Sequence, residues 1–402
     1  MPHPGAGFVG GETVGLNGHN MTDLPTEHPW YAQRTHSSPL VSAATGQRPA
    51  RRPVWFMRQA GRSLPEYRRA REGISMLDSC LRPDLAAEIT LQPVRRHGVD
   101  AAIFFSDIVI PMRLAGIDVE ITPGVGPVVE APVRTEDDIA ALEASSSDDF
   151  DEALAPIREA IAITTAELGA TPLIGFCGAP FTVASYLVEG GPSREYLRTK
   201  AMMHSRPDLW HRLGAWVADR SGRFLRAQVE AGASAVQLFD SWAGGLSLAE
   251  YTQLVQRHSA AVFSHVDDLP VPRIHFGVNT SELLVAMRAA GATVMGVDHR
   301  LPLDEANRRL GGDIPLQGNL DPAMLFASAQ ARTEALQRVL RQGASAPGHI
   351  LNLGHGVPKD TDSAVLTDLV AQVHDTPVHE TPVHESPVRE TPAATPTEGG
   401  TR

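Results

Sequence analysis

Two arginines, Arg58 and Arg62, lie four residues apart on either side of a glycine in the segment R-Q-A-G-R. A guanidinium group stays charged at physiological pH and binds a carboxylate through two parallel hydrogen bonds. We therefore predict that both side chains bind the anionic groups of a ligand. Arg71 follows closely and would add to the same positive field, whereas we expect Arg68 and Arg69 to form surface salt bridges.

An aspartate, Asp107, ends the apolar segment A-A-I-F-F-S-D. A carboxylate in such surroundings needs polar partners, because burying an unpaired charge is costly. Two interpretations stay open from the spacing alone. Asp107 either caps the helix that follows, or it faces the cationic or N–H-rich side of a ligand.

A histidine, His355, stands between two glycines, which would let the backbone approach a ligand closely. The alternative is an ordinary loop histidine. No Cys or His stands at metal-ligand spacing from His355, and no H-E-x-x-H segment occurs in the sequence, so we predict no metal site.

Cys80 and Cys177 are far apart and are expected to be small core residues. The only lysines, Lys200 and Lys359, leave few positions for a Schiff base, and we predict no cofactor.

Short apolar runs alternate with helical patterns and predict the strands of a parallel sheet. The helical segment 208–230 ends before Gly232, and the segment 281–290 ends before Gly291, as expected of glycine caps. Eight such units indicate a single (β/α)8 TIM barrel, and a doubly wound sheet is the alternative. The predicted strands are residues 54–57, 101–106, 173–176, 235–239, 273–276, 294–297, 314–317 and 350–353.

In such a barrel the active site lies at the carboxyl ends of the strands. Polar residues follow most of the predicted strands, and we expect them to converge at one rim. They include Arg58, Asp107, Asp240, Ser241, Asp298, His299, Asn319 and His355.

The two ends of the chain lack core-forming patterns. We predict disordered extensions at residues 1–38 and 375–402, the second of which repeats T-P-V-H-E. The G-x-G-x-x-G match at residues 5–10 follows no strand, so it does not indicate a dinucleotide site.

The net charge of −12 argues against nucleic-acid or anionic-membrane partners. No signal peptide or run of about 20 apolar residues is present, so we expect a soluble, cytoplasmic protein.

Residues 39–374 resemble the uroporphyrinogen decarboxylase family. The matching segments are W-F-M-R-Q-A-G-R-S-L-P-E-Y-R, F-F-S-D-I, G-F-C-G-A-P-F-T-V-A-S-Y-L-V-E-G, L-F-D-S-W-A-G and N-L-G-H-G-V. The resemblance implies a (β/α)8 barrel, usually a homodimer with facing clefts. It also implies cofactor-free removal of four acetate carboxyls from uroporphyrinogen III, giving coproporphyrinogen III in porphyrin and heme biosynthesis. The substrate-binding positions that it implies are Arg58, Gln59, Ala60, Gly61, Arg62, Arg71, Asp107, Tyr186, Ser241 and His355.

The implied chemistry agrees with the residues. The substrate carries eight carboxylates for the arginines, and its four pyrrole N–H groups can converge on Asp107. A protonated pyrrole accepts the electrons of decarboxylation, and Asp107 would stabilise that cation. Asp107 and Arg58 are thus the predicted catalytic residues, with Arg58 supplying or relaying a proton. Trp242 and Gly245 stand where relatives vary. A zinc-dependent methyltransferase and a non-catalytic tetrapyrrole carrier remain alternatives.

Overall fold

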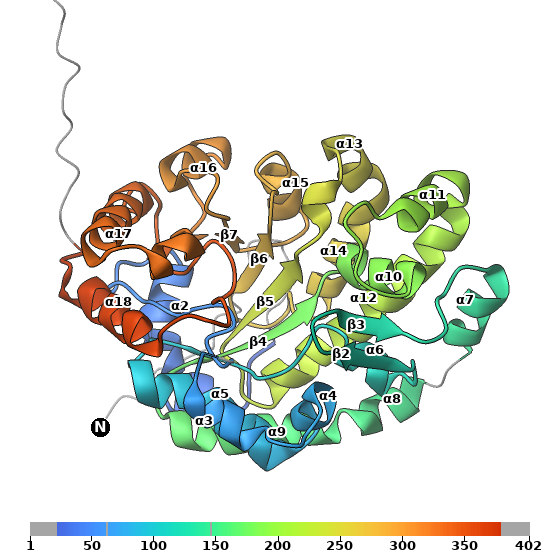
Figure 1. Ribbon diagram of the computed structural model, residues 1–402, viewed down its shortest axis with the longest axis horizontal. Coiled ribbons are helices and arrows are strands. Elements are labelled where there is room, and N and C mark those ends of the chain that lie inside the picture. The colour runs from blue at the N-terminus through green and yellow to red at the C-terminus, as the bar shows by residue number, and fades with distance from the viewer. Residues whose placement is uncertain (1–21, 62, 145–146, 379–402) are drawn as a thin grey trace, which may run out of the picture.

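Seven parallel strands form the centre of the molecule in the computed structural model, which describes residues 22–61, 63–144 and 147–378 (Figure 1). Their order in the sheet is β1-β4-β5-β6-β7-β8-β9, so neighbours in the sequence are neighbours in space. The strands are β1 Ala102–Ile103, β4 Leu173–Gly178, β5 Ala235–Asp240, β6 Arg273–Gly277, β7 Val294–Gly296, β8 Leu316–Gln317 and β9 His349–Ile350.

Residues 53–55 close the sheet into a barrel. Val54 forms a parallel bridge with Leu351, just after β9, and the N–H of Leu351 donates to the carbonyl of Pro53 at 2.9 Å. On the other side, the N–H of Asp100, just before β1, donates to the carbonyl of Val54 at 2.8 Å. The predicted (β/α)8 barrel is therefore confirmed, although residues 54–57 contribute bridges and not a regular strand.

Helices surround the strands (Figure 1). The predicted segment 208–230 forms α12, and α15 is shorter than predicted; a glycine with positive φ, Gly232 or Gly291, follows each. The helices before α9 are α1 Pro29–Ala32, η1 Thr35–Ser37, α2 Pro39–Ala44, α3 Pro65–Ala70, α4 Met76–Cys80, α5 Pro83–His97, α6 Ile110–Leu114, α7 Glu136–Glu143 and α8 Ser147–Ala153. The others are α9 Ala155–Leu168, α10 Pro180–Glu189, α11 Leu197–Ser205, α12 Pro207–Glu230, η2 Ala243–Gly245, α13 Leu248–Glu250, η3 Tyr251–Val255, α14 Gln256–Ser264, α15 Leu284–Ala289, α16 Leu303–Arg309, η4 Pro322–Phe326, α17 Ala329–Gly343 and α18 Ser363–Asp375.

An antiparallel hairpin, β2 Val119–Thr122 and β3 Gly126–Val129, is an addition to the barrel that the sequence analysis did not predict. It belongs to the chain between β1 and β4, and the N–H of Val129 donates to the carbonyl of Gly190, just after α10, at 3.1 Å. The hairpin is therefore tied to the helix that carries Tyr186.

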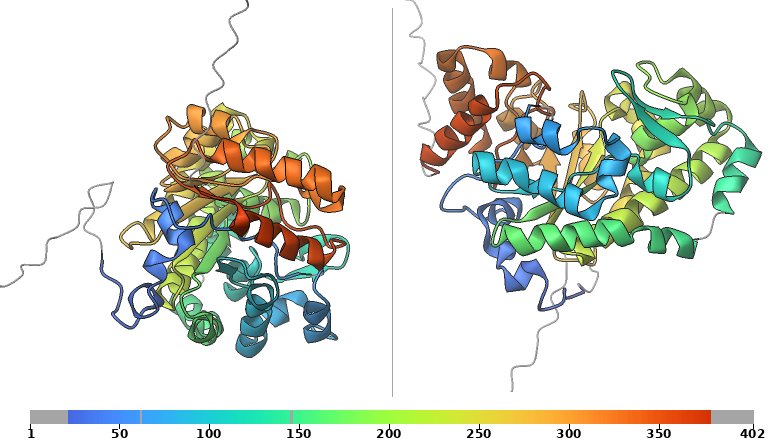
Figure 2. Two further views of the ribbon diagram at one scale, coloured as in Figure 1. Left: turned by 90° about the vertical axis from the view of Figure 1, so that its left-hand side faces the viewer. Right: turned by 60° about the horizontal axis from the view of Figure 1, so that its bottom comes forward.

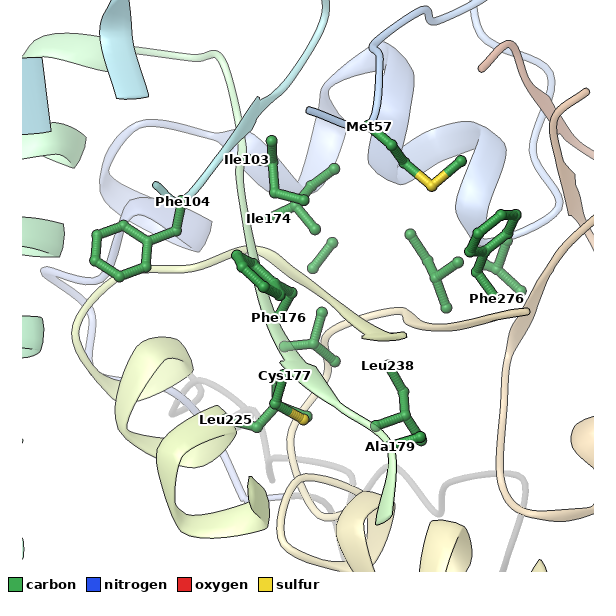
Figure 3. Close-up of a cluster of buried hydrophobic side chains, with 14 of the residues drawn as sticks. Met57, Ile103, Phe104, Ile174, Phe176, Cys177, Ala179, Leu225, Leu238 and Phe276 are labelled. Atoms are coloured by element: carbon green, nitrogen blue, oxygen red, sulfur yellow. The ribbon is translucent and has the colours of Figure 1, made fainter. Parts of the chain in front are cut away.

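The core has two layers, inside the barrel and between strands and helices. Phe176 packs edge-to-face on Phe239, with 5.4 Å between ring centroids, and Phe239 packs on Phe276 at 6.1 Å. Cys177, one residue along β4 from Phe176, lies beside Leu225 of α12 in the second layer (Figure 3). Because successive strand residues face opposite sides, β4 contributes to both layers. Cys80 and Cys177 are free and fully buried, which confirms that they are core residues.

Residues 22–38 pack against the barrel, so the predicted disordered extension 1–38 is wrong for this part. Trp30 is buried, and the His28 ring bonds to the carbonyl of Val229 at 2.7 Å. Thr35 Oγ1 lies 2.7 Å from Oγ of Ser234, which directly precedes β5. The segment, dark blue in Figure 2, therefore covers the amino ends of strands. Residues 1–21 of the predicted extension lie outside the described residues.

The last helix ties the C-terminal part of the chain to the barrel. His374 Nε2 lies 2.7 Å from Oδ2 of Asp100, and Gln337 Nε2 donates to Oγ1 of Thr376 at 3.3 Å. The predicted tail therefore begins too early at residue 375, and residues 379–402 lie outside the described residues. Within the described ranges, no helix is long and apolar enough to span a membrane.

Candidate active site

The loop after residues 53–57 carries Arg58, whose backbone is left-handed with φ of 61°. Its exposed side chain crosses Gly356, where an added Cβ would lie 2.6 Å from Cδ of Arg58. The N–H of Val357 also donates to the carbonyl of Met57 at 2.8 Å. The loops after the first and last strands are thus held together, and Arg58 and His355 meet at the same rim as predicted.

The side chain of Gln59 is not placed to contact a ligand. Its side chain is fully buried, and Nε2 donates to the carbonyl of Ala101 while Oε1 accepts from the N–H of Phe56, both at 3.0 Å. This side chain holds the loop against β1. Ala60 and Gly61 are partly exposed on the same loop. Arg62 lies outside the described residues.

Asp107 follows β1 and is partly exposed. Its Oδ1 accepts from the N–H of Val109 at 3.1 Å, which stabilises the turn before α6. Helix α6 itself begins at Ile110 without a side-chain cap, so the capping interpretation holds only for this turn. Burial by the surrounding protein raises the pKa of Asp107, while the N–H of Val109 and the positive charge of Arg58 oppose that rise.

Tyr186 on α10 belongs to the same electrostatic cluster. Burial and then the negative charge of Asp107 raise the pKa of its hydroxyl, Arg58 opposes, and the result is a pKa of about 12. The phenol is therefore neutral at pH 7 and can donate a hydrogen bond. Three side chains that lie far apart in the sequence, Arg58, Asp107 and Tyr186, thus influence one another at the carboxyl ends of the strands.

His355 presents a single N–H to the rim. Its Nδ1 accepts from the N–H of Gly356 at 2.7 Å, so the proton of the neutral ring is on Nε2. Burial and then the charge of Arg58 lower the pKa of His355, with smaller contributions from His299 and Arg300. His299 was predicted at this rim from its place after a strand, whereas no role was predicted for Arg300.

Arg71 is held by its own loop. Its Nη1 donates to Oη of Tyr67 at 2.6 Å, and its Nε donates to Oγ of Ser79 at 3.1 Å. The guanidinium therefore ties α3 to α4, and its charge acts on the buried thiol of Cys80. Arg68 and Arg69 are exposed, and neither has a salt bridge within the described part of the chain, contrary to the prediction.

An aromatic stack flanks this cluster. Ser241, partly exposed, follows β5, and the ring of Trp242 beside it stacks between Tyr186 at 4.0 Å and Tyr196 at 5.1 Å. An added Cβ at Gly245 would lie 2.6 Å from the ring of Tyr196, which explains the glycine. Tyr196 was not predicted to belong to the site, because it lies between two helices and not after a strand.

The described residues contain no group of three His, Cys, Asp or Glu that could hold a metal ion. The fold and the cluster define a (β/α)8 barrel whose rim brings a carboxylate, an arginine, a neutral phenol and an imidazole N–H together. Donors that surround a single carboxylate suit a ligand that carries both anionic groups and N–H groups.

The family model of uroporphyrinogen decarboxylase matches residues 35–376, and the chain belongs to this family. A uroporphyrinogen decarboxylase of Arthrobacter sp. (strain FB24) is 63% identical over 341 residues, which are 85% of this chain and 98% of that protein. The one from Rhodococcus opacus is 58% identical over 356 residues, 87% of this chain and 99% of its own. A solved methyltransferase from Methanosarcina mazei has a TM-score of 0.70 at 20% identity, covering 83% of this chain and 97% of its own. That likeness shows the fold alone.

Proposed function

We propose that the chain removes the four acetate carboxyl groups of uroporphyrinogen III and yields coproporphyrinogen III and CO2 in porphyrin and heme biosynthesis. The observation that carries this proposal is the 63% identity to a uroporphyrinogen decarboxylase over 98% of that protein. The arrangement of Arg58, Asp107 and Tyr186 at one rim supports it. The enzyme is accordingly a carboxy-lyase.

We assign the substrate contacts of these side chains by their charge. Arg58, Arg62 and the Nε2–H of His355 bind substrate carboxylates, and the hydroxyl of Tyr186 donates a further hydrogen bond. Asp107 accepts the pyrrole N–H groups at the centre of the macrocycle. Its turn with Val109 holds Oδ1 in place before the substrate arrives, so little reorganisation is needed.

The reaction needs an electron sink but no cofactor. Protonation of a pyrrole carbon gives a cation, the bond to the acetate carboxyl carbon breaks, and its electron pair neutralises the ring as CO2 leaves. A second proton then converts the exocyclic carbon to methyl and the first is released, so that one proton replaces each CO2. Asp107 stabilises the cation. We assign the supply or relay of the proton to Arg58, whose positive charge also favours the carboxylate form of Asp107.

We further propose a cytoplasmic homodimer that binds neither nucleic acid nor membrane. Apolar side chains at the carboxyl side of the barrel are exposed in the single chain, at Leu197 of α11, Leu248 of α13 and Phe326 of η4. Burial of such side chains would favour association. The net charge of −12 disfavours nucleic acid and anionic lipid.

A zinc-dependent methyltransferase is the second candidate, and the cysteines argue against it. Cys177 is fully buried, and burial raises its pKa well above the usual range, so it is a poor source of thiolate. Cys80 is equally buried.

Turnover separates the candidates. The protein is treated with a chelator, freed of metal and incubated anaerobically with reduced uroporphyrinogen III. We expect coproporphyrinogen III and four molecules of CO2 for each substrate consumed. Binding without release of CO2 would indicate a carrier, and activity that returns only with zinc would favour the methyltransferase.

A further inference from the structure

Behind the aromatic stack lies a buried polar relay made of Thr182 on α10, Asp240 at the end of β5 and the backbone of Trp242. Thr182 and Asp240 are fully buried. Thr182 Oγ1 donates to Oδ1 of Asp240 at 3.0 Å, and the N–H of Trp242 donates to Oγ1 of Thr182 at 3.2 Å. One hydroxyl thus acts as donor and acceptor at the point where the chain leaves β5.

A buried histidine lies on the other side of Asp240. His275 on β6 places Nε2 3.7 Å from Oδ2 of Asp240, and both side chains are fully buried. The Nδ1–H of His275 donates to the carbonyl of Met287 at 3.1 Å, which sets the orientation of the ring. Within the described part of the chain, Oδ2 of Asp240 and Nε2 of His275 have no hydrogen-bond partner. The relay therefore joins α10 to the end of β5, and the ring of His275, which is bonded to α15, packs beside it.

The relay ends at the ring stack that faces the rim. Fixing the peptide of Trp242 fixes the start of its side chain, and the Trp242 ring lies 4.0 Å from that of Tyr186. The charges of Asp107 and Arg58 act on the pKa of the Tyr186 hydroxyl, so the ring stacked on Trp242 belongs to the same cluster as those two side chains. Thr182 lies on the same helix as Tyr186, four residues earlier.

We propose that Thr182 and Asp240 are positioning residues of the decarboxylase: they hold the Ser241–Trp242 turn and thereby the ring of Tyr186 against the substrate. This inference rests on the proposed function for the identity of the substrate. Neither side chain needs to touch the substrate, since both are buried. A displacement of about 1 Å in a substrate-positioning group can reduce the rate about 10²-fold.

Replacement of Thr182 tests the relay. Thr182→Val keeps the shape of the side chain but removes both hydrogen bonds, whereas Thr182→Ser keeps the hydroxyl. Thr164→Val is the matched control, because Thr164 is equally buried and donates only to the carbonyl of Ala160 in its own helix. The measurements are KM and kcat with uroporphyrinogen III, near-ultraviolet circular dichroism of the stacked rings, and the urea midpoint.

We expect Thr182→Val to lower kcat/KM about tenfold or more, mostly through KM, and to change the near-ultraviolet spectrum. Thr182→Ser should restore both. Thr164→Val should lower the urea midpoint without changing kinetics or spectrum. Asp240→Asn should act mildly, because the amide oxygen still accepts from Thr182.

A second variant decides the matter if Thr182→Val does not fold. Gly245→Ala leaves the relay intact but pushes a methyl group against the ring of Tyr196 at the exposed end of the stack. We expect the same rise in KM with little loss of stability. Parental kinetics and spectrum in the folded variants would overturn the proposal. If the parent shows no decarboxylation, the proposed function fails, and the spectra alone still test the relay.

Discussion

Asp107 lies between opposing influences that set its behaviour. Burial favours its neutral form, whereas the N–H of Val109 and the charge of Arg58 favour its carboxylate form. The net result is a pKa above the ordinary value of about 4. A carboxylate that destabilises the folded protein is expected where binding of a cationic intermediate later compensates for the burial.

Removal of this charge should stabilise the folded protein. The pKa of Asp107 is higher in the folded chain than in the unfolded chain. The Asp107 carboxylate therefore lowers the free energy of unfolding at a pH above its pKa in the folded chain. This destabilisation disappears at a pH below its pKa in the unfolded chain. Asp107→Asn retains an acceptor for the N–H of Val109. We expect its urea midpoint to exceed that of the parent at pH 7, with a difference that shrinks as the pH falls toward 4. A lower midpoint at pH 7 would contradict the electrostatic account.

The position of Arg58 should depend on Gly356. Gly356→Ala would place a methyl group 2.6 Å from Cδ of Arg58 and displace the guanidinium. We expect kcat/KM to fall roughly tenfold to hundredfold at nearly constant melting temperature. Gly191→Ala is the control, because the nearest atom to its new Cβ is 3.7 Å away. Equal kinetics in the two variants would show that Arg58 does not act from this position.

Residue types and strand ends were sufficient to predict part of the site. Arg58, Asp107 and His355 follow apolar runs, and a barrel brings such positions together. The role of Gln59 as a support for the loop was not predictable, because its partner Ala101 lies in another unit. Tyr196 was also missed, since its place in the stack depends on the packing of α11 against η2 and not on a sequence period.

At the scale of elements, the N-terminal helices contribute to stability. Trp30 is 8% exposed and packs in the hydrophobic core. A protein that begins at Pro39 should lose urea stability relative to one that begins at Thr22, and Trp30→Ala should cost about 3 kcal/mol of unfolding free energy. Tyr31→Ala is the control, because Tyr31 is 39% exposed and should change stability by about 0.5 kcal/mol or less. An unchanged midpoint for the protein that begins at Pro39 would contradict this role.

The same elements show where sequence patterns fail. The long helix α12 has a strong period, and strands β4 and β5 are continuous apolar runs, so all three were predicted to within two residues of their observed bounds. Helices α1 and η1 have four and three residues, too few for a period, and their stability comes from tertiary contacts such as the bond from His28 to Val229. The hairpin β2–β3 was missed for the same reason.

The whole chain has a net charge of −12, and the exposed side chain of Arg58 lies at the rim. Arg58 lies at the rim, and Arg300 nearby is paired with Asp298 at 2.9 Å, whereas the net charge of the chain repels an octa-anion. Salt screens exposed charges over about 10 Å at 0.1 M. We expect KM for uroporphyrinogen to rise with ionic strength while kcat changes little, as measured between low salt and about 0.5 M salt. A KM that falls steadily with salt would show that repulsion by the net negative charge outweighs attraction by the arginines at the rim.

The turnover of Asp107→Asn tests the central claim most directly. Asparagine retains the size and one acceptor oxygen but cannot offset the charge of a protonated pyrrole. We predict a folded protein whose kcat for uroporphyrinogen III is about 10²–10³-fold below that of the parent, with a smaller change in KM. Asparagine caps a turn about as well as aspartate. A kcat within a few-fold of the parent would therefore contradict the catalytic role of Asp107. Its only remaining role would be to stabilise the turn before α6.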